Sequence, residues 1–117
     1  MNLKYFKLAE FNCQVTGDNK MEPEFLEKLD LLRAGCGFPF VIVSGYRHPL
    51  EHPIEATKGV PGTHAQGIAA DIQVTSGAQR YLIVKQALAL GFTGIGVSKT
   101  FVHVDTRGTR PAMWTYF

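Results

Sequence analysis

The clearest strand in this sequence is Phe101-Val102-His103-Val104-Asp105, because apolar and polar side chains alternate along it. Successive side chains of a β-strand point to opposite faces, so Phe101, His103 and Asp105 share one face and the two valines share the other. The valines suit a buried core. We therefore expect His103 and Asp105 to face a surface or a cleft.

Three other segments have the apolar or glycine-rich patterns of a small sheet, and they are Phe40–Val43, Ala69–Thr75 and Gly94–Val97. The first is an apolar, β-branched run that predicts a short buried strand. The second predicts a strand with Asp71 and Gln73 on the face opposite Ile72 and Val74. The third is expected to be a turn that leads into a strand, and residues 100–105 either continue that strand or pair with it.

Two helices are predicted from apolar residues at helical spacing. The first begins at residues 22–24, Glu-Pro-Glu, where proline suits the first turn and the acids face the positive helix end; the glycines of residues 35–37 stop it. The second covers residues 79–90 and ends at Gly91. Helices mixed with short, hairpin-like strands predict an α+β fold with an antiparallel sheet and flanking helices.

The length of 117 residues fits a single domain, with residues 1–38 as a lead-in and helix and residues 39–117 as the core that carries the candidate site. Hydrophobic residues make up 45% of the chain and charged residues 19%, so it can bury a core. The formal net charge of +2 is too small to indicate a nucleic-acid-binding protein. No segment approaches the ~20 apolar residues of a membrane span, so no membrane insertion is expected.

Cys13 and Cys36 are the only cysteines and form no CxxC pair, so they do not make a zinc site by themselves. We predict two free or partly buried thiols, with a disulfide between them as the alternative. The first thirteen residues contain no apolar stretch long enough for a secretion signal. We therefore expect a protein that stays in the cytoplasm until something else releases it.

Two imidazoles and one carboxylate are the first candidates for chemistry. His64 follows a long loop with three prolines, Asp71 comes seven residues later, and His103 lies in the last strand. Such a set is common at catalytic zinc sites, where three protein ligands leave the fourth position to water. Spacing alone does not separate a zinc site from unrelated surface histidines.

Four segments occur in a fixed order, and they are Ser44-Gly45-Tyr46-Arg47, His64-Ala65-Gln66-Gly67-Ile68-Ala69-Ala70-Asp71, Gly94–Val97 and Phe101–Asp105. Together they resemble the zinc D-Ala-D-Ala carboxypeptidase family of murein peptidases. The resemblance is greatest to its small phage and bacterial branch, which has the motifs S-G-Y-R, H-x-x-G-x-A-x-D and F-V-H-V-D. It covers roughly residues 40–116.

This resemblance implies a fold like that of Hedgehog and the D-Ala-D-Ala peptidases, with Zn²⁺ held by His64, Asp71 and His103. It also implies that Arg47 points into the cleft and binds a substrate carboxylate or the developing oxyanion, a structural ion pair being the alternative. The implied activity is hydrolysis of a peptide bond in peptidoglycan stem peptides by a carboxypeptidase or endopeptidase that resembles an endolysin. We expect a monomer of phage, prophage or bacterial origin that is released to the cell wall. Which bond is cut stays open.

Two positions depart from the pattern of this family. Gly62 stands where many relatives have serine, and Thr100 stands where several branches have an acid, three residues before the last zinc histidine. Asp105 then becomes the nearest candidate for the catalytic general base, or else a partner that orients an imidazole. The missing acid also keeps an alternative open: a catalytically inactive, zinc-containing cell-wall-binding module or phage structural component.

Further side chains of the long loop and the C-terminal segment are candidates for the site. The long loop offers additional candidates for the base, namely His48, Glu51, His52 and Glu55. Trp114 and Tyr116 either cap the core or form a wall of the substrate groove, and we favour the core.

Overall fold

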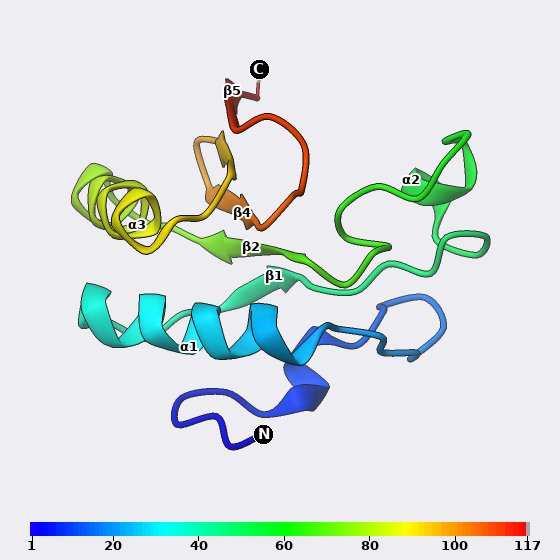
Figure 1. The fold of residues 1–117 in the computed structure, drawn as a ribbon, viewed down its shortest axis with the longest axis horizontal. Coiled ribbons are helices and arrows are strands. Elements are labelled where there is room, and N and C mark those ends of the chain that lie inside the picture. The colour runs from blue at the N-terminus through cyan, green and yellow to red at the C-terminus, as the bar shows by residue number, and fades with distance from the viewer. Residues whose placement is uncertain (117) are drawn as a thin grey trace.

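One mixed sheet and the helices packed against it make up residues 1–116, which this computed structural model describes (Figure 1). In chain order the elements are the 3-10 helix η1 (Leu8–Phe11), α1 (Pro23–Cys36), β1 (Ile42–Ser44), α2 (Pro53–Ala56), β2 (Ala69–Gln73), α3 (Gly77–Leu90), β3 (Gly94–Val97), β4 (Phe101–Asp105) and β5 (Ala112–Thr115). The predicted α+β fold is confirmed.

The five strands lie in the order β1-β2-β4-β3-β5. Neighbouring strands from β1 to β3 are antiparallel, as expected, but β5 pairs with β3 in parallel. The purely antiparallel expectation is therefore wrong at this edge. The reason is topological: the chain leaves β4, passes β3 and returns on its far side, so β5 runs against β4 and along β3.

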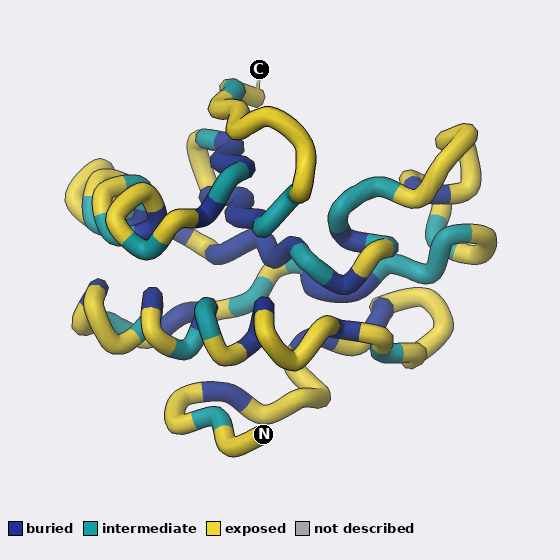
Figure 2. Tube along the Cα trace, in the orientation of Figure 1, coloured by how far each residue is buried: buried dark blue, intermediate teal, exposed yellow. Residues whose placement is uncertain are grey.

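The apolar core lies between the helices and one face of the sheet. Val102 and Val104 are fully buried there, as their alternation predicts, and α1 and α3 contact each other across the same cluster. The lead-in also contributes, since Phe6 and Phe11 belong to this cluster. Figure 2 shows the buried residues concentrated where the helices and the lead-in meet the central strands.

The predicted helices are present, with shifted ends. α1 continues through Gly35 and ends at Gly37, which adopts the left-handed conformation (φ 73°) that glycine reaches without strain. α3 begins two residues earlier than expected, because the side chain of Ser76 accepts a hydrogen bond from the backbone N–H of Gln79 and caps the helix.

The predicted buried strand at residues 40–43 is wrong in position and environment. The strand covers Ile42–Ser44 and forms an edge of the sheet, where Val41 and Val43 are exposed. Only Phe40, just before it, is buried. A short apolar run indicates a strand, but its pattern cannot tell a central strand from an edge strand.

Cys13 and Cys36 are buried, free thiols. None of the helices in the described part of the chain has both the length and the apolar character needed to cross a membrane.

The packing of α1 makes a matched pair of variants available. Leu29 is 0% exposed and Leu31 is 60% exposed on the same helix. We expect Leu29→Ala to lower the free energy of unfolding by about 2–5 kcal/mol, since it removes buried methyl groups and leaves a cavity. Leu31→Ala is expected to change it by less than about 0.5 kcal/mol. Urea unfolding measures both values, and equal effects would contradict this assignment of the core.

Candidate metal centre

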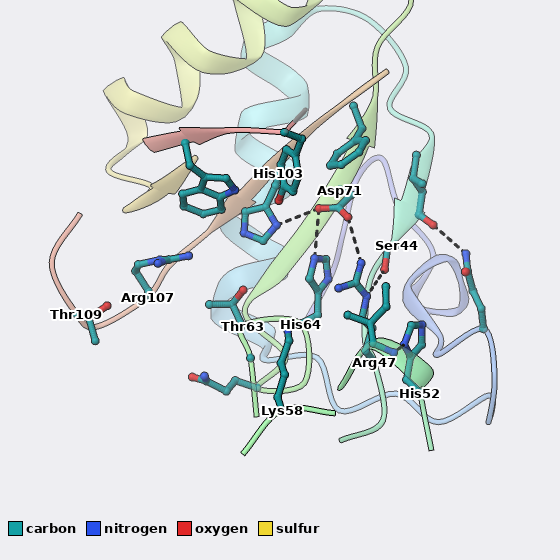
Figure 3. Close-up of a pocket in the computed structure, with 18 of the residues that line it drawn as sticks. Ser44, Arg47, His52, Lys58, Thr63, His64, Asp71, His103, Arg107 and Thr109 are labelled. Carbon is teal, nitrogen blue, oxygen red and sulfur yellow. Dashed lines mark hydrogen bonds and ion pairs between the residues drawn. The ribbon is translucent and has the colours of Figure 1, made fainter. Parts of the chain in front are cut away.

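The register of the central strand pair brings Asp71 and His103 together. β2 and β4 are antiparallel with Asp71 directly opposite His103, and opposed residues of such a pair point to the same side of the sheet. This side is opposite to the one that Ile72 and Val102 present to the core. Both polar side chains are nevertheless buried, at the bottom of a pocket (Figure 3).

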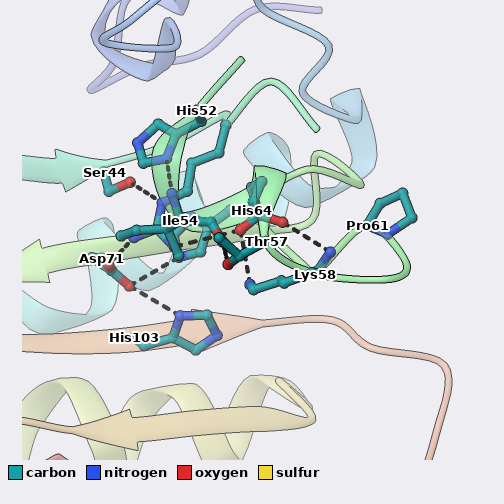
Figure 4. Close-up of polar contacts among 12 residues, drawn as sticks. Ser44, His52, Ile54, Thr57, Lys58, Pro61, His64, Asp71 and His103 are labelled. Atoms are coloured by element: carbon teal, nitrogen blue, oxygen red, sulfur yellow. Dashed lines mark hydrogen bonds and ion pairs between the residues drawn. The ribbon is translucent and has the colours of Figure 1, made fainter. Parts of the chain in front are cut away.

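His64 reaches the same point from the end of the long loop. Its Nδ1 lies 2.7 Å from the carbonyl oxygen of Gly45, and its Nε2 lies 3.2 Å from Oδ1 of Asp71. Nδ1 of His103 lies 3.0 Å from the same Oδ1 (Figure 4). The three predicted metal ligands therefore converge on one point, and one atom of each lies within 4.8 Å of the others.

In each imidazole, the hydrogen bond made by the nitrogen that points away from Asp71 determines whether the other nitrogen presents a lone pair to Asp71. A carbonyl oxygen only accepts, so a neutral His64 carries its proton on Nδ1 and presents a lone pair on Nε2 to Asp71. His103 is reversed: its Nε2 lies 2.7 Å from Oδ2 of Asp105, which leaves the lone pair on Nδ1. Three acceptor atoms thus face one another, an arrangement that attracts a cation.

The spacing of these atoms fits zinc. A tetrahedral zinc ion with bonds of about 2.1 Å holds neighbouring ligand atoms about 3.4 Å apart. The separations of 3.0 and 3.2 Å between Asp71 and the two histidines need only a slight widening, and the two imidazole nitrogens lie within 4.8 Å of each other. Two imidazole nitrogens and one carboxylate oxygen are also an ordinary donor set for zinc, and they leave one position open.

Contacts within the cluster set its protonation. Burial would raise the pKa of Asp71, but the hydrogen bonds that His103 and His64 donate when they carry a second proton, together with the charge of those rings, outweigh burial and hold this pKa well below the usual range. Burial would lower the pKa of His103, but the carboxylates of Asp105 and Asp71 outweigh burial and raise it. The cluster therefore holds negative charge and attracts positive charge, either protons or a metal ion.

Asp105 lies behind His103 and is 0% exposed. Besides the contact with His103, its oxygens accept hydrogen bonds from Nη2 of Arg107 at 2.7 Å, and from Nε and the backbone N–H of Arg107 at 3.0 Å each. These contacts keep the pKa of Asp105 well below its usual range although burial opposes the shift. Of the two roles predicted for Asp105, this geometry favours the one that orients the imidazole.

Two glycines of β3 leave room for this arrangement. Gly94 pairs with Asp105 and Gly96 pairs with His103. A Cβ atom at Gly94 would overlap the carboxylate of Asp105, and one at Gly96 would lie 2.6 Å from Nε1 of Trp114. The turn predicted at residues 94–97 is wrong, because these residues form a strand in which the glycines provide space. The pairing of residues 100–105 with this segment, one of the two predicted alternatives, is confirmed.

Arg47 joins the metal centre to the long loop. Its Nε donates to Oγ of Ser44 at 3.1 Å, and its Nη2 donates to Oδ2 of Asp71 at 3.4 Å. Its Nη1 lies 3.8 Å from the buried carboxylate of Glu55. Arg47 also lines the pocket. It therefore lies in the cleft and takes part in ion pairs, the two alternatives predicted from the sequence.

Aromatic side chains form one wall of the pocket, which has a volume of about 960 Å³. Trp114 lies with its ring centroid 5.1 Å from that of His103, and the guanidinium of Arg107 lies 4.7 Å from the indole ring. Tyr116 is also part of the lining and is exposed. The preference for a core-capping role is therefore wrong, because β5 lies at the sheet edge on the pocket side.

The candidates in the long loop have different environments. His52 lines the pocket, and its Nδ1 accepts a hydrogen bond from the backbone N–H of Ile54 at 3.2 Å. His48 instead caps the amides of residues 50 and 51, outside the pocket lining, and Glu51 is exposed. Glu55 is buried.

Sequence reasoning missed two cations of the pocket lining, Lys58 and Arg107. Arg107 follows Asp105 by two residues, so extending the strand period beyond residue 105 would have placed it near the site. Lys58 lies in a loop, where no periodic signal exists.

Gly94 offers a test of the space behind His103. We expect Gly94→Ala to displace Asp105 and to weaken zinc binding about 10–100-fold, the usual cost of losing a partner that orients a ligand. Gly59→Ala is the control, because a Cβ there meets no other atom within 4 Å. Competition with a chelating dye measures the affinity. Unchanged binding in Gly94→Ala would show that Asp105 does not support the site.

Comparison with known proteins agrees with the ordered motifs. The family model for peptidase M15 matches residues 4–105, which is most of the chain and includes all three candidate ligands. No curated protein is significantly similar to the chain in sequence. Peptidases of this family are zinc-dependent, and the donor set described above fits zinc. The chain therefore belongs to the peptidase M15 family, that of the zinc D-Ala-D-Ala carboxypeptidases.

Proposed function

We propose that this protein is a zinc-dependent peptidase that hydrolyses a peptide bond in the stem peptides of bacterial peptidoglycan. Membership of a peptidase family supports hydrolysis of a peptide. The observation that carries the proposal is the convergence of His64, Asp71 and His103 at the bottom of a pocket large enough for a peptide segment.

The residues around the site have complementary roles in this reaction. A bound zinc ion would supply a Lewis acid that polarises the scissile carbonyl and makes water acidic enough to attack near neutral pH. Gly45 and Asp105 hold the imidazoles of His64 and His103 with their lone pairs inward. Arg47 has N–H groups left for the substrate, because its guanidinium carries five and the contacts above use three.

Two neutral side chains of the pocket, His52 and Tyr116, would donate hydrogen bonds to acceptor groups of the substrate. The pKa of His52 is lowered by burial and by the charge of Arg47, so its imidazole is neutral near pH 7. Because Nδ1 accepts from Ile54, the proton is on Nε2, which is then a hydrogen-bond donor. Burial raises the pKa of Tyr116, which keeps its hydroxyl protonated.

Charge in the pocket suits an acidic peptide. Arg47, Lys58 and Arg107 line it, and Asp71 is the only carboxylate among the described residues of the lining. In Figure 3 Arg107 and Thr109 lie on one side of Asp71 and His103, and Arg47 and His52 on the other. A groove on both sides of the metal centre fits cleavage within a stem peptide. We also propose that the protein meets this substrate once it is released to the cell wall.

The metal centre is tested by removing one ligand. We expect the purified protein to hold one zinc ion per chain, and His64→Ala to lose both the zinc and any release of peptide fragments from purified peptidoglycan. His48→Ala is the matched control, because His48 lies outside the pocket lining. Elemental analysis and mass spectrometry of the fragments measure the two properties. A His64→Ala protein that still digests peptidoglycan would refute the proposal.

Asp105→Asn separates the two roles considered for Asp105. If Asp105 orients His103, the variant should bind zinc about 10–100-fold more weakly and recover most of its turnover when zinc is saturating. If Asp105 is the general base, zinc affinity should stay the same and turnover should remain low at every zinc concentration. We expect the first result, because Asp105 is buried behind the ring and bonded to Arg107.

A second candidate function is supported by the pocket lining itself. Asp71 is the only carboxylate among the described residues of the lining, and Thr100 stands in place of an acid, so the lining offers no second carboxylate to act as general base. A zinc-containing module that binds peptidoglycan without cutting it fits this observation. Binding of purified peptidoglycan by the zinc-loaded protein without release of fragments would identify such a module.

A further inference from the structure

The long loop beside the metal centre is anchored in an unusual way. Between Arg47 and Thr63, all of which the structure describes, Glu55 is the only buried residue. It is 2% exposed, whereas the apolar side chains of the loop, such as Leu50 and Val60, are exposed. A carboxylate rather than an apolar cluster therefore fixes this wall of the pocket.

Three donors surround the buried carboxylate. The backbone N–H of Gly62 donates to Oε1 at 3.0 Å, and Nζ of Lys58 donates to Oε2 at 2.8 Å. Nη1 of Arg47 lies 3.8 Å from Oε2. An unpaired carboxylate would be very costly at such a buried position, so these partners determine whether the loop can close there.

Glu55 is charged in this setting. Burial would raise its pKa, but the hydrogen bonds from Lys58 and Gly62 outweigh burial and lower it below the ordinary value. It therefore attracts cations to its position at neutral pH.

Gly62 shows how closely this carboxylate is enclosed. A Cβ atom at residue 62 would lie 3.1 Å from Oε1 of Glu55 and 2.6 Å from Nζ of Lys58. The glycine that departs from the family's pattern thus leaves room for the ion pair of Glu55 and Lys58.

Charges alternate from the pocket rim to the metal centre. Lys58 contacts Glu55, Glu55 contacts Arg47, and Arg47 contacts Asp71. The carboxylates of Glu55 and Asp71 thus attract the guanidinium of Arg47 from two different sides. Lys58 lines the pocket with its side chain 41% exposed, and two of its three N–H groups remain for another partner.

We propose that Glu55 is a positioning residue of this site, which holds Arg47 and Lys58 as a pair of cations that bind a carboxylate group of the peptide substrate. The inference rests on the proposed function and specifies one group that the substrate carries. Glu55 acts through the two cations and does not itself touch the substrate.

Glu55→Gln tests this role with two matched peptides. The variant keeps the size of the side chain and an oxygen for Gly62 but loses the charge that attracts the two cations. For a stem peptide with free carboxylates we expect KM to rise about tenfold, the effect of one charge-assisted hydrogen bond, with kcat within about twofold. For the same peptide with its carboxylates amidated, KM should stay unchanged. Glu51→Gln, an exposed acid of the same loop, should behave as wild type.

Two further variants separate positioning from a general loss of structure. Glu55→Asp keeps the charge and should restore part of the preference for the carboxylate peptide. In a Lys58→Met background, the effect of Glu55→Gln on KM should shrink, because one of the two cations through which it acts is gone. An equal loss on both peptides, or full additivity with Lys58→Met, would overturn the proposal.

Failure of the proposed function is recognised separately. If the zinc-loaded wild-type protein cuts neither peptide, the peptidase proposal fails, and the same comparison is made by calorimetric binding of the two peptides. Weaker binding of only the carboxylate peptide by Glu55→Gln then supports the role of Glu55. Equal binding of both peptides by wild type and variant overturns it.

Discussion

Two imidazole nitrogens and one carboxylate oxygen, each with a lone pair directed inward, face one another at the metal centre. Oδ1 of Asp71 lies 3.2 Å from His64 and 3.0 Å from His103. Such an arrangement is unfavourable unless a cation lies between the acceptors, and most of the surrounding structure serves to maintain it. The carbonyl of Gly45 and the carboxylate of Asp105 accept the outer N–H groups, which prevents either ring from turning its lone pair away.

The metal centre also needs space for the side chains of Asp105 and Trp114, and glycines in β3 leave that space because they have no side chain. β3 runs beside β4 with glycines opposite His103 and Asp105. The carboxylate of Asp105 occupies the place of one missing side chain, and the indole of Trp114 lies over the other. The opposite face of the same strands is filled with aliphatic side chains under α1 and α3, so the metal centre is built on a rigid support.

The two sides of the centre are held by charge. Behind His103, Asp105 is paired with Arg107, and in front of Asp71, Arg47 is paired with Glu55. In both chains of contacts a buried carboxylate stabilises a cation that lines the pocket. The pocket therefore presents positive charge to a substrate even though acids are buried around it.

The alternation of residues 101–105 and the apolar spacing of the two helices determined the α+β fold, because side-chain period is a local property. Residue type made His64, Asp71 and His103 candidates, and the resemblance of the ordered motifs to a zinc peptidase family selected them. The edge position of β1, the parallel pairing of β5 and the placement of Trp114 on the pocket wall were decided by tertiary structure, since they depend on which strand the chain returns to. The contacts of Asp105 and Glu55 were likewise undetermined in the sequence. Alternation puts Asp105 on the same strand face as His103, but only the packed chain supplies the contacts with His103 and Arg107 that favour one of its two roles. An acid in a loop, such as Glu55, carries no sign of which donors will surround it.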